Sequence, residues 1–390
     1  MLSADSLPTL QRAIADAKLD GWLLYDFRGN NPIANSMLAL EGFVSRRVFA
    51  FVPARGAPTA ITHDIEQGPW ARWPAAWTRE HYSSWRTLDA LLAGLVGGKR
   101  IAMEYSPGDA VPYLDYVPGG VLEMVRAAGA EVVSSAELVT KFYAVWTPVQ
   151  LESHVRAAEI VARTGRAAIA HAGQRFTAGT PVSETELQQW IAKRFAEQGL
   201  SSDHDPIVAA GANASNPHYA PSPERLIVGG DTLLVDLWAK EPDGIFADQT
   251  WMGSLGAPSP RALSVWEAVR DARDASITLL RERAVAKQPT RGADVDDAAR
   301  GVITARGFGQ YFTHRTGHSI DARALHGSGP HMDNYETREE RTLVPGVAFS
   351  IEPGIYIAGE IGMRSEVNVY AGDGEVIVTP QEIQRDLIVV

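Results

Sequence analysis

The sequence contains no cysteine in its 390 residues. This absence excludes disulfide bonds, thiolate nucleophiles, paired-cysteine redox centres and zinc sites with sulfur ligands. No apolar run approaches the roughly 20 residues that a membrane-spanning helix requires. The first twenty residues also lack the basic start and apolar stretch of a secretory signal peptide. We therefore expect a cytoplasmic protein that has no membrane partner.

An excess of positive charge is missing as well. Asp and Glu outnumber Lys and Arg by 47 to 36, which gives a formal net charge of −11. Because nucleic acids and anionic membranes attract a basic face, we expect neither as the main partner. The signatures GxSxG, GxGxxG, HExxH and the phosphate-binding P-loop are also absent. The activities that these signatures mark are therefore not indicated.

The chain divides into two segments of different pattern. Up to about residue 140, short strand-like runs alternate with helical stretches, which is typical of an α/β domain. The proline-containing stretch KFYAVWTPVQ, at 141–150, interrupts this pattern. We therefore predict a smaller domain of residues 1–145 and a larger one of residues 146–390.

Capping signals predict where helices begin in the larger domain. Ser183 and Glu186 form a capping box, and Ser259 stands directly before Pro260, so a helix is expected at each point. A further helix is expected over 293–307, with Asp294 as its cap. Apolar runs predict strands within three stretches, 225–240, 347–357 and 365–379, the last as a hairpin that turns at Asp373–Gly374.

Four carboxylates interrupt apolar, strand-like stretches: Asp236 in LLVDLW, Asp248 in GIFADQTW, Glu352 in FSIEPG and Glu366 in GMRSEVNV. For any one such acid, a structural role at a strand end or turn is at least as frequent as a functional role. Four ionised acids cannot share an apolar core without cations, and two divalent ions would balance their charge. Oxygen ligands with one imidazole and no sulfur suit Mn²⁺, Co²⁺, Zn²⁺ or Fe²⁺.

Histidines gather in the same domain. Four of the ten lie in HRTGHSIDARALHGSGPH: His314, His318, His326 and His331. A single histidine is more often an ordinary hydrogen-bonded or exposed ring than a ligand. Four of them in eighteen residues favour a role in metal binding or catalysis.

The order and spacing of five positions resemble the dinuclear metallopeptidases of the pita-bread fold, which include methionine aminopeptidase, proline-specific aminopeptidase and prolidase. The matching positions are Asp236, Asp248, His318, Glu352 and Glu366. The resemblance covers about residues 150–390. It implies an α+β fold, a curved mixed or antiparallel sheet with helices outside, after a smaller α/β domain like that of creatinase and prolidase. It also implies a homodimer.

The resemblance further implies that the five positions bind two divalent ions per subunit, Mn²⁺ or Zn²⁺ ahead of Co²⁺ or Fe²⁺. Glu352 would also shuttle a proton of the bridging water. His218 and His326 match catalytic histidines on the substrate side, with His331 as an alternative to His326. Three more residues match substrate-binding and neighbouring groups of the proline-specific enzymes: His314, Tyr356 and Arg364.

The implied activity is hydrolysis of the Xaa-Pro bond in dipeptides, or at the N-terminus of short peptides, by a hydroxide that bridges two metal ions. Two other functions of this fold remain as alternatives, a metal-free creatinase-like amidinohydrolase and a non-catalytic peptide-binding module. The presence of all five ligand positions favours the peptidase. Departures from the family pattern at Leu237–Trp238 and at SIDARAL, after His318, leave the shape of the pocket open, as well as the choice between dipeptidase and aminopeptidase.

Overall fold

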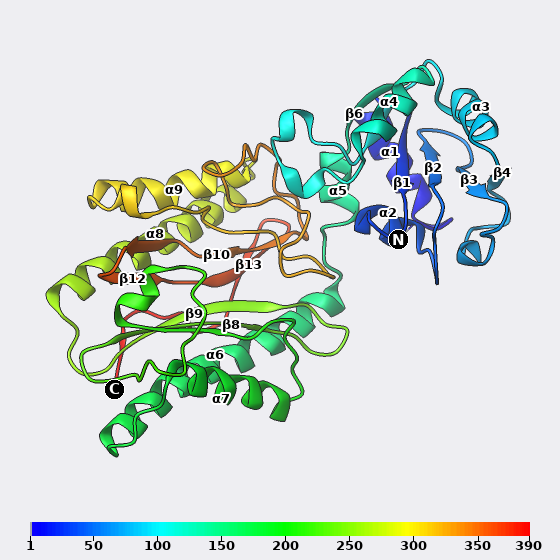
Figure 1. Cartoon of the computed structure of the whole chain (residues 1–390). Helices are drawn as coiled ribbons and strands as arrows, with labels where there is room; N and C mark the ends of the chain where they lie inside the picture. The colour runs from blue at the N-terminus through cyan, green and yellow to red at the C-terminus, as the bar shows by residue number, and fades with distance from the viewer. Residues whose placement is uncertain (1) are drawn as a thin grey trace. The chain divides into compact units, whose positions relative to one another are not determined.

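The computed structural model describes residues 2–390, which divide after Tyr143 into two compact units (Figure 1). The first unit holds a six-stranded sheet in the order β4-β3-β2-β1-β5-β6. Its strands are β1 (Gly21–Asp26), β2 (Val48–Pro53), β3 (Thr59–His63), β4 (Thr78–Tyr82), β5 (Arg100–Met103) and β6 (Glu131–Ser134). β2 runs antiparallel to both of its neighbours, and the other pairs are parallel.

Helices cover both faces of this sheet, which explains why every residue of β1 is buried. Trp22 and Leu24 pack in an apolar cluster with α1 (Leu7–Asp16), α2 (Pro32–Leu38) and α5 (Ala136–Phe142). Leu23 and Tyr25 point the other way and pack with α3 (Trp85–Val96) and α4 (Gly119–Ala127). The α/β pattern predicted for this segment is confirmed.

Glu104, which directly follows β5, is a fully buried carboxylate in the first unit. It accepts hydrogen bonds from Trp22 Nε1 at 2.6 Å, from Asn31 Nδ2 at 2.8 Å and from Ser135 Oγ at 3.2 Å. Burial raises the pKa of Glu104 from 4.5 to about 7, although these three donors oppose the rise. The folded protein therefore holds a proton on Glu104 that the unfolded chain releases at lower pH.

Glu104→Gln is expected to remove this part of the pH dependence. The contribution of Glu104 to the free energy of unfolding is complete below pH 4.5 and is lost as the pH rises to about 7. The difference between wild type and variant should therefore change by about 3 kcal/mol across this window. Urea titrations at three pH values measure it, with the exposed Glu123→Gln as the control. A difference that does not vary with pH would refute the shifted pKa.

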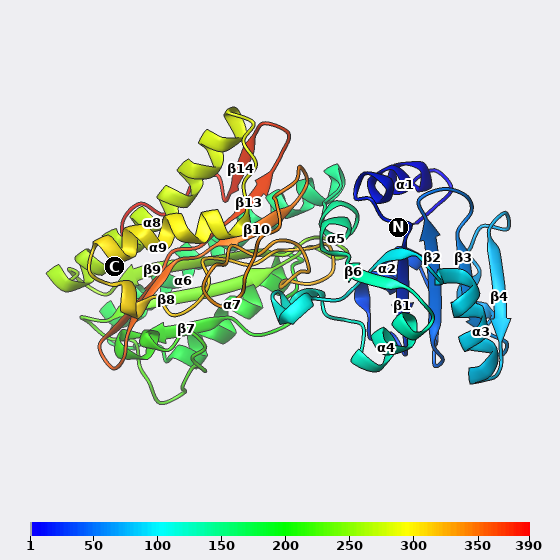
Figure 2. The same ribbon diagram turned by 90° about the horizontal axis from the view of Figure 1, so that it is seen from above.

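The second unit opens with two helices, α6 (Pro148–Thr177) and α7 (Glu184–Glu197). In Figure 1 they lie below a sheet whose order is β15-β9-β8-β7. Its strands are β7 (Ile207–Ala210), β8 (Thr232–Ala239), β9 (Ala247–Ser254) and β15 (Ile388–Val389). Two further helices, α8 (Pro260–Val285) and α9 (Gly292–Ala305), lie side by side (Figure 2). In Figure 1 they lie above the strands coloured orange to red. Among residues 2–390, no helix has the length and apolar character needed to span a membrane.

The predicted helix starts are largely confirmed. Ser183 and Glu186 exchange both hydrogen bonds of a capping box at the start of α7, and Ser259 caps α8. Asp294 is not the N-cap of α9, because the helix begins at Gly292. Its carboxylate instead accepts a hydrogen bond from Arg291 N at 3.0 Å, from inside the first turn. In the stretch 225–240, only the part that forms β8 is a strand.

The strand expected over 347–357 is instead two strands, β10 (Ala348–Ile351) and β11 (Gly354–Ile357). The break falls at Glu352 and Pro353, where proline has no N–H to donate to a neighbouring strand. The segment that pairs with these two strands is interrupted at the same level, between β12 (Ile361–Arg364) and β13 (Val367–Ala371). β10 pairs with β13 and β11 pairs with β12, so the two paired segments are interrupted at one shared position, here called the crease. Glu352 and Glu366 stand opposite each other at this crease. The predicted hairpin of β13 and β14 (Val376–Thr379) is present.

Candidate metal centre

Two of the predicted acidic ligands lie on neighbouring strands. β8 and β9 pair so that Asp236 stands opposite Thr250 and Trp238 stands opposite Asp248. Side chains two residues apart in a strand point to the same face, so Asp236, Trp238 and Asp248 share one face. Asp236 and Asp248 are therefore diagonal neighbours on this sheet.

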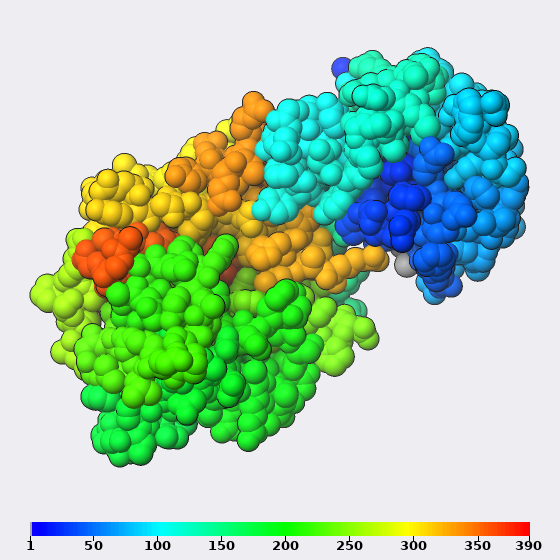
Figure 3. All heavy atoms as spheres, viewed as in Figure 1, coloured from blue at the N-terminus to red at the C-terminus, as the bar shows by residue number. Residues whose placement is uncertain are grey.

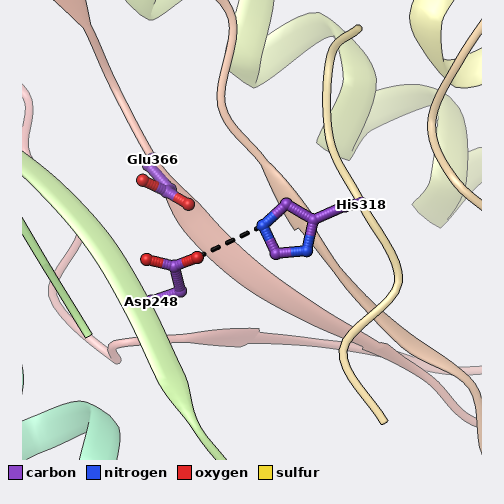
Figure 4. Close-up of side chains that lie close together, drawn as sticks. All are labelled: Asp248, His318 and Glu366. Carbon is purple, nitrogen blue, oxygen red and sulfur yellow. Dashed lines mark ion pairs between the residues drawn. The ribbon is translucent and has the colours of Figure 1, made fainter. Parts of the chain in front are cut away.

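Asp248, His318 and Glu366 come together in the second unit (Figure 4). One ligand atom from each lies within 4.8 Å of the others, and all three residues are buried. The Nε2 atom of His318 is 3.2 Å from Asp248 Oδ2. Asn368 fixes the backbone at Asp248, since it accepts from Asp248 N at 2.9 Å and donates to Asp248 O at 2.8 Å. Three of the five predicted ligands thus form one compact cluster.

Glu352 is the fourth predicted ligand at this place. Its Oε1 atom lies 3.5 Å from His318 Nε2 and accepts a hydrogen bond from Ser350 Oγ at 2.9 Å. The same hydroxyl oxygen accepts from the backbone N–H of His318 at 2.9 Å. Ser350 therefore holds Glu352 and His318 together.

Arg364 supplies a positive charge among these acids. Its guanidinium pairs with Asp236 and donates to Thr250 Oγ1 at 2.8 Å. It also lies 3.9 Å from Glu352 and 3.8 Å from Glu366, and it is only 4% exposed. Thr250 Oγ1 passes the interaction on by donating to Glu366 Oε2 at 2.8 Å. Asp236, the fifth predicted ligand, is thus engaged by Arg364.

The acids differ in how their surroundings shift their pKa values. Burial and repulsion by neighbouring carboxylates raise the pKa values of Asp236 and Asp248 to about 7, and that of Glu366 well above its ordinary value. Although burial opposes it, the nearby His318 ring and the positively charged Arg364 hold the pKa of Glu352 below its ordinary value. Burial lowers the pKa of His318, which favours the neutral imidazole that metals bind.

These residues fit a divalent cation. Glu366 Oε1 is buried and has no hydrogen-bond partner among residues 2–390, a costly situation for a carboxylate oxygen. The single guanidinium of Arg364 cannot neutralise four carboxylates. The remaining negative charge requires protons or cations, and the raised pKa values express this requirement. A site built from carboxylates and one imidazole suits a borderline or hard divalent metal.

The structure distinguishes the two histidines that could serve beside His318. The ring of His326 is exposed and packs against the ring of His318, with 4.2 Å between centroids. Partial burial against its neighbours lowers the pKa of His326 to about 4. His331 is fully buried, and its Nδ1 accepts from the backbone N–H of Ser319 at 3.4 Å. His326 therefore has the open position next to the cluster.

Tyr356 links the acids to a second histidine. Its hydroxyl lies 3.1 Å from Arg364 Nη1 and 2.9 Å from His314 Nε2. Burial raises the pKa of Tyr356 to about 12 and lowers that of His314 to about 4. Both side chains therefore stay neutral near pH 7, and the phenol keeps its proton.

His218 stands apart from the other predicted site residues. It is exposed, and its backbone N–H donates to Asn216 Oδ1 at 3.2 Å. Among the hydrogen bonds of residues 2–390, none joins it to the acids or histidines described above.

Sequence reasoning missed three polar residues of this site: Thr250, Ser350 and Asn368. Each stands two residues from a predicted ligand and contacts a ligand directly. The two-residue period of a strand brings such a neighbour to the same face as the ligand. This period was the available signal for all three.

Residues 152–373 match the model of metallopeptidase family M24, which is more than half of the chain. The chain belongs to this family. It is therefore a metallopeptidase, and the predicted pita-bread metallopeptidase is confirmed. Family M24 is metal-dependent, in agreement with the buried cluster of Asp248, His318 and Glu366.

Curated proteins similar to this chain include some that are named as dipeptidases. The chain is 28% identical over 344 residues to a protein of Mycobacterium tuberculosis named "Probable dipeptidase PepE", with 87% of this chain and 84% of that one covered. It is 34% identical over 170 residues to the "Xaa-Pro dipeptidase" of Lactobacillus helveticus, which covers 43% of this chain and 42% of that one.

Solved structures show the same fold. Dipeptidase PepE from Mycobacterium ulcerans aligns with a TM-score of 0.76 at 24% identity and covers 99% of this M24 chain and 97% of its own. The prolidase from Thermococcus sibiricus aligns with a TM-score of 0.66 at 24% identity over the full length of both chains. The fold of this M24 peptidase is thus the pita-bread fold, as expected.

Proposed function

We propose that this peptidase is an exopeptidase that cleaves the Xaa-Pro bond of dipeptides or of short peptides, with two divalent ions as cofactors. The observation that carries the proposal is the buried cluster of Asp248, His318 and Glu366 with an unpartnered oxygen on Glu366. The Xaa-Pro dipeptidase among the relatives, 34% identical over its matching part, supports the choice of substrate.

Five residues would hold the ions: Asp236, Asp248, His318, Glu352 and Glu366. Divalent ions at this position supply Lewis-acid activation of the scissile carbonyl and of the attacking water. Mn²⁺ and Zn²⁺ suit this set of donors. Glu352, with a depressed pKa and its carboxylate fixed by Ser350, accepts a proton and passes it toward the leaving nitrogen.

The neutral side chains around the cluster meet the substrate. His326 lies open beside His318 and donates to the carbonyl oxygen as charge develops there. Tyr356 OH accepts from Arg364 Nη1 and donates to Nε2 of the neutral His314, whose Nδ1 donates to Arg315 O, so we assign these two side chains to shaping the substrate side next to Arg364. Arg364 is buried and pairs with Asp236. We therefore assign to Arg364 the role of orienting Asp236, rather than that of binding a substrate carboxylate directly.

An Xaa-Pro bond is a tertiary amide, so its site needs no acceptor for an amide hydrogen. We expect the metal-loaded protein to cleave Ala-Pro with at least about tenfold higher kcat/KM than Ala-Ala, the range that a fitted pocket provides. The assay includes Ala-Pro-Ala and Ala-Ala-Ala, with metal content measured on the same sample and chelator-treated protein as the control.

The outcome separates the alternatives. Equal rates on Ala-Pro and Ala-Ala would reject proline specificity and leave a general dipeptidase. Cleavage of Ala-Pro-Ala identifies an aminopeptidase. Full activity in chelated, metal-free protein would reject the metal-dependent mechanism.

A further inference from the structure

Glu184, in the first turn of α7, is fully buried and accepts hydrogen bonds from a single distant segment. Its Oε1 atom accepts from Ala210 N at 2.7 Å and from Asn213 Nδ2 at 3.0 Å. Its Oε2 atom accepts from Tyr219 OH at 2.7 Å and from Ser222 N at 3.2 Å. These donors lie on both sides of His218 in the sequence. One carboxylate thus ties together the two ends of the loop that carries this histidine.

The bonds to Glu184 form a closed network. Asn213 Nδ2 also donates to Tyr219 OH at 2.7 Å, so that Glu184, Asn213 and Tyr219 contact one another. Burial, followed by the hydrogen bond to Glu184, raises the pKa of Tyr219 to about 12, which keeps the phenol a donor. A carboxylate only accepts, and it can accept from all of these groups at once. An amide at position 184 would turn an NH₂ group toward some of these donors and leave them unpaired.

The same loop also packs on the β11–β12 hairpin. The first part of the loop is a short 3-10 helix, η4 (Gly211–Ser215). A Cβ atom added to Gly362 of β12 would lie 1.7 Å from Ala214 O, so glycine is required for this close approach. Gly359 N also donates to Ser215 Oγ at 3.1 Å. Figure 3 shows the orange-red surface near residue 360 directly beside the green surface of this region.

The loop is therefore held between Glu184 and the hairpin that carries Tyr356 and Arg364. Among residues 2–390, the one hydrogen bond of His218 runs from its backbone N–H to Asn216 Oδ1, so the direction of its ring depends on how the loop is held.

We propose that Glu184 is a positioning residue that fixes the loop 211–222 and thereby aims His218 at the substrate. This inference rests on the proposed function, to which it adds the substrate-side role of His218 that the family resemblance implies. Among the hydrogen bonds of residues 2–390, none joins Glu184 to the cluster of Asp248, His318 and Glu366 or to the hairpin, so its effect passes through the loop.

A double-substitution cycle tests the inference. Glu184→Gln and His218→Ala are each expected to lower kcat/KM on Ala-Pro about 10- to 100-fold in metal-loaded protein, the cost of a misplaced catalytic-site group. In the His218→Ala background, Glu184→Gln should add less than about twofold, because its target is gone. Metal content should equal that of wild type. Glu186→Gln is the matched control, since glutamine also completes a capping box on the same helical turn.

A second measurement keeps the test independent of the substrate. Amide hydrogen exchange over residues 211–222 should be at least about tenfold faster in Glu184→Gln than in Glu186→Gln. If Glu184→Gln fails to fold, Tyr219→Phe, which removes one donor, takes its place in the same cycle. Effects that multiply in the cycle, or unchanged exchange in the loop, would overturn the positioning role. If wild type cleaves no peptide, the proposed function fails, and the exchange experiment still decides the role of Glu184 in holding the loop.

Discussion

Asp248→Asn is expected to produce a protein that has lost its activity but is more stable than wild type when metal is removed. The Asp248 carboxylate lies beside Glu352 and Glu366, and its pKa is raised from 3.8 to about 7, so its ionisation destabilises the metal-free fold. Asparagine removes this charge and keeps the backbone bonds with Asn368. At pH 8 the chelated variant should melt at least about 3 °C higher than chelated wild type, which is roughly 1 kcal/mol in a domain of this size.

Added metal is expected to reverse this order of stability, so that wild type melts at a higher temperature than Asp248→Asn. A ligand contributes more than an outer-shell group, whose loss already costs about 10- to 100-fold in affinity, so Asp248→Asn should bind metal at least about 100-fold more weakly. Mn²⁺ or Zn²⁺ should then raise the melting temperature of wild type and leave the variant nearly unchanged. Loss of kcat/KM follows the loss of metal.

The pH dependence provides the internal check for this variant. A raised folded-state pKa contributes stability that is complete below pH 3.8 and disappears as the pH rises through 7. The advantage of chelated Asp248→Asn over chelated wild type should therefore be absent near pH 4 and grow up to pH 8. The exposed Asp243→Asn, in the turn between β8 and β9, is the control. Equal melting of the two chelated proteins at pH 8 would contradict the account.

Arg364→Met is expected to destabilise the metal-free protein by about 3–5 kcal/mol, the cost of leaving buried charges without their partner. Arg364 contacts Asp236 and lies within 4 Å of Glu352 and Glu366, so all three acids lose a neighbouring cation. Bound metal should reduce the deficit, because divalent ions replace the missing charge. Urea unfolding with and without metal measures both quantities.

Two further variants define what Arg364 contributes. Arg364→Lys keeps the charge but not the planar guanidinium that reaches Thr250 and Tyr356. The stability of this variant should therefore lie between that of wild type and that of Arg364→Met. Asp236→Asn combined with Arg364→Met removes both partners and should recover part of the lost stability without metal. An Arg364→Met protein as stable as wild type after chelation would show that the guanidinium does not balance the acids.

Much of the fold could be predicted from local sequence signals. The capping residues of α7 and α8 mark where these helices begin, because hydrogen bonds near the helix start depend on local residues alone. The break between β10 and β11 was harder to foresee. Pro353 shows that one strand is interrupted, but the matching break before β13 depends on pairing between chain segments that no local pattern contains.

The candidate site, like the fold, could be predicted from the sequence only in part. The positions of Asp248, His318 and Glu366 could be predicted from the sequence, and the structure brings them together. The link from Arg364 to Asp236 could not, because it depends on how a long side chain crosses between two sheets. The exposed position of His218 likewise depends on the loop held by Glu184, which lies more than thirty residues earlier in the chain.

The crease at Glu352 and Glu366 has a consequence for how such a peptidase can diversify. Both acids stand where two paired strands are interrupted together, while Tyr356 and Arg364 belong to the hairpin beyond the break. Across the break, Ser365 N still donates to Pro353 O at 3.3 Å, and the side chain of Arg364 reaches from the hairpin to Asp236. Mutations that reshape the substrate side can therefore accumulate with little disturbance of the acids only where they leave Arg364 in place, because its guanidinium pairs with Asp236 and lies within 4 Å of Glu352 and Glu366. Arg364 is thus the residue of the hairpin through which a change on the substrate side would reach the acids.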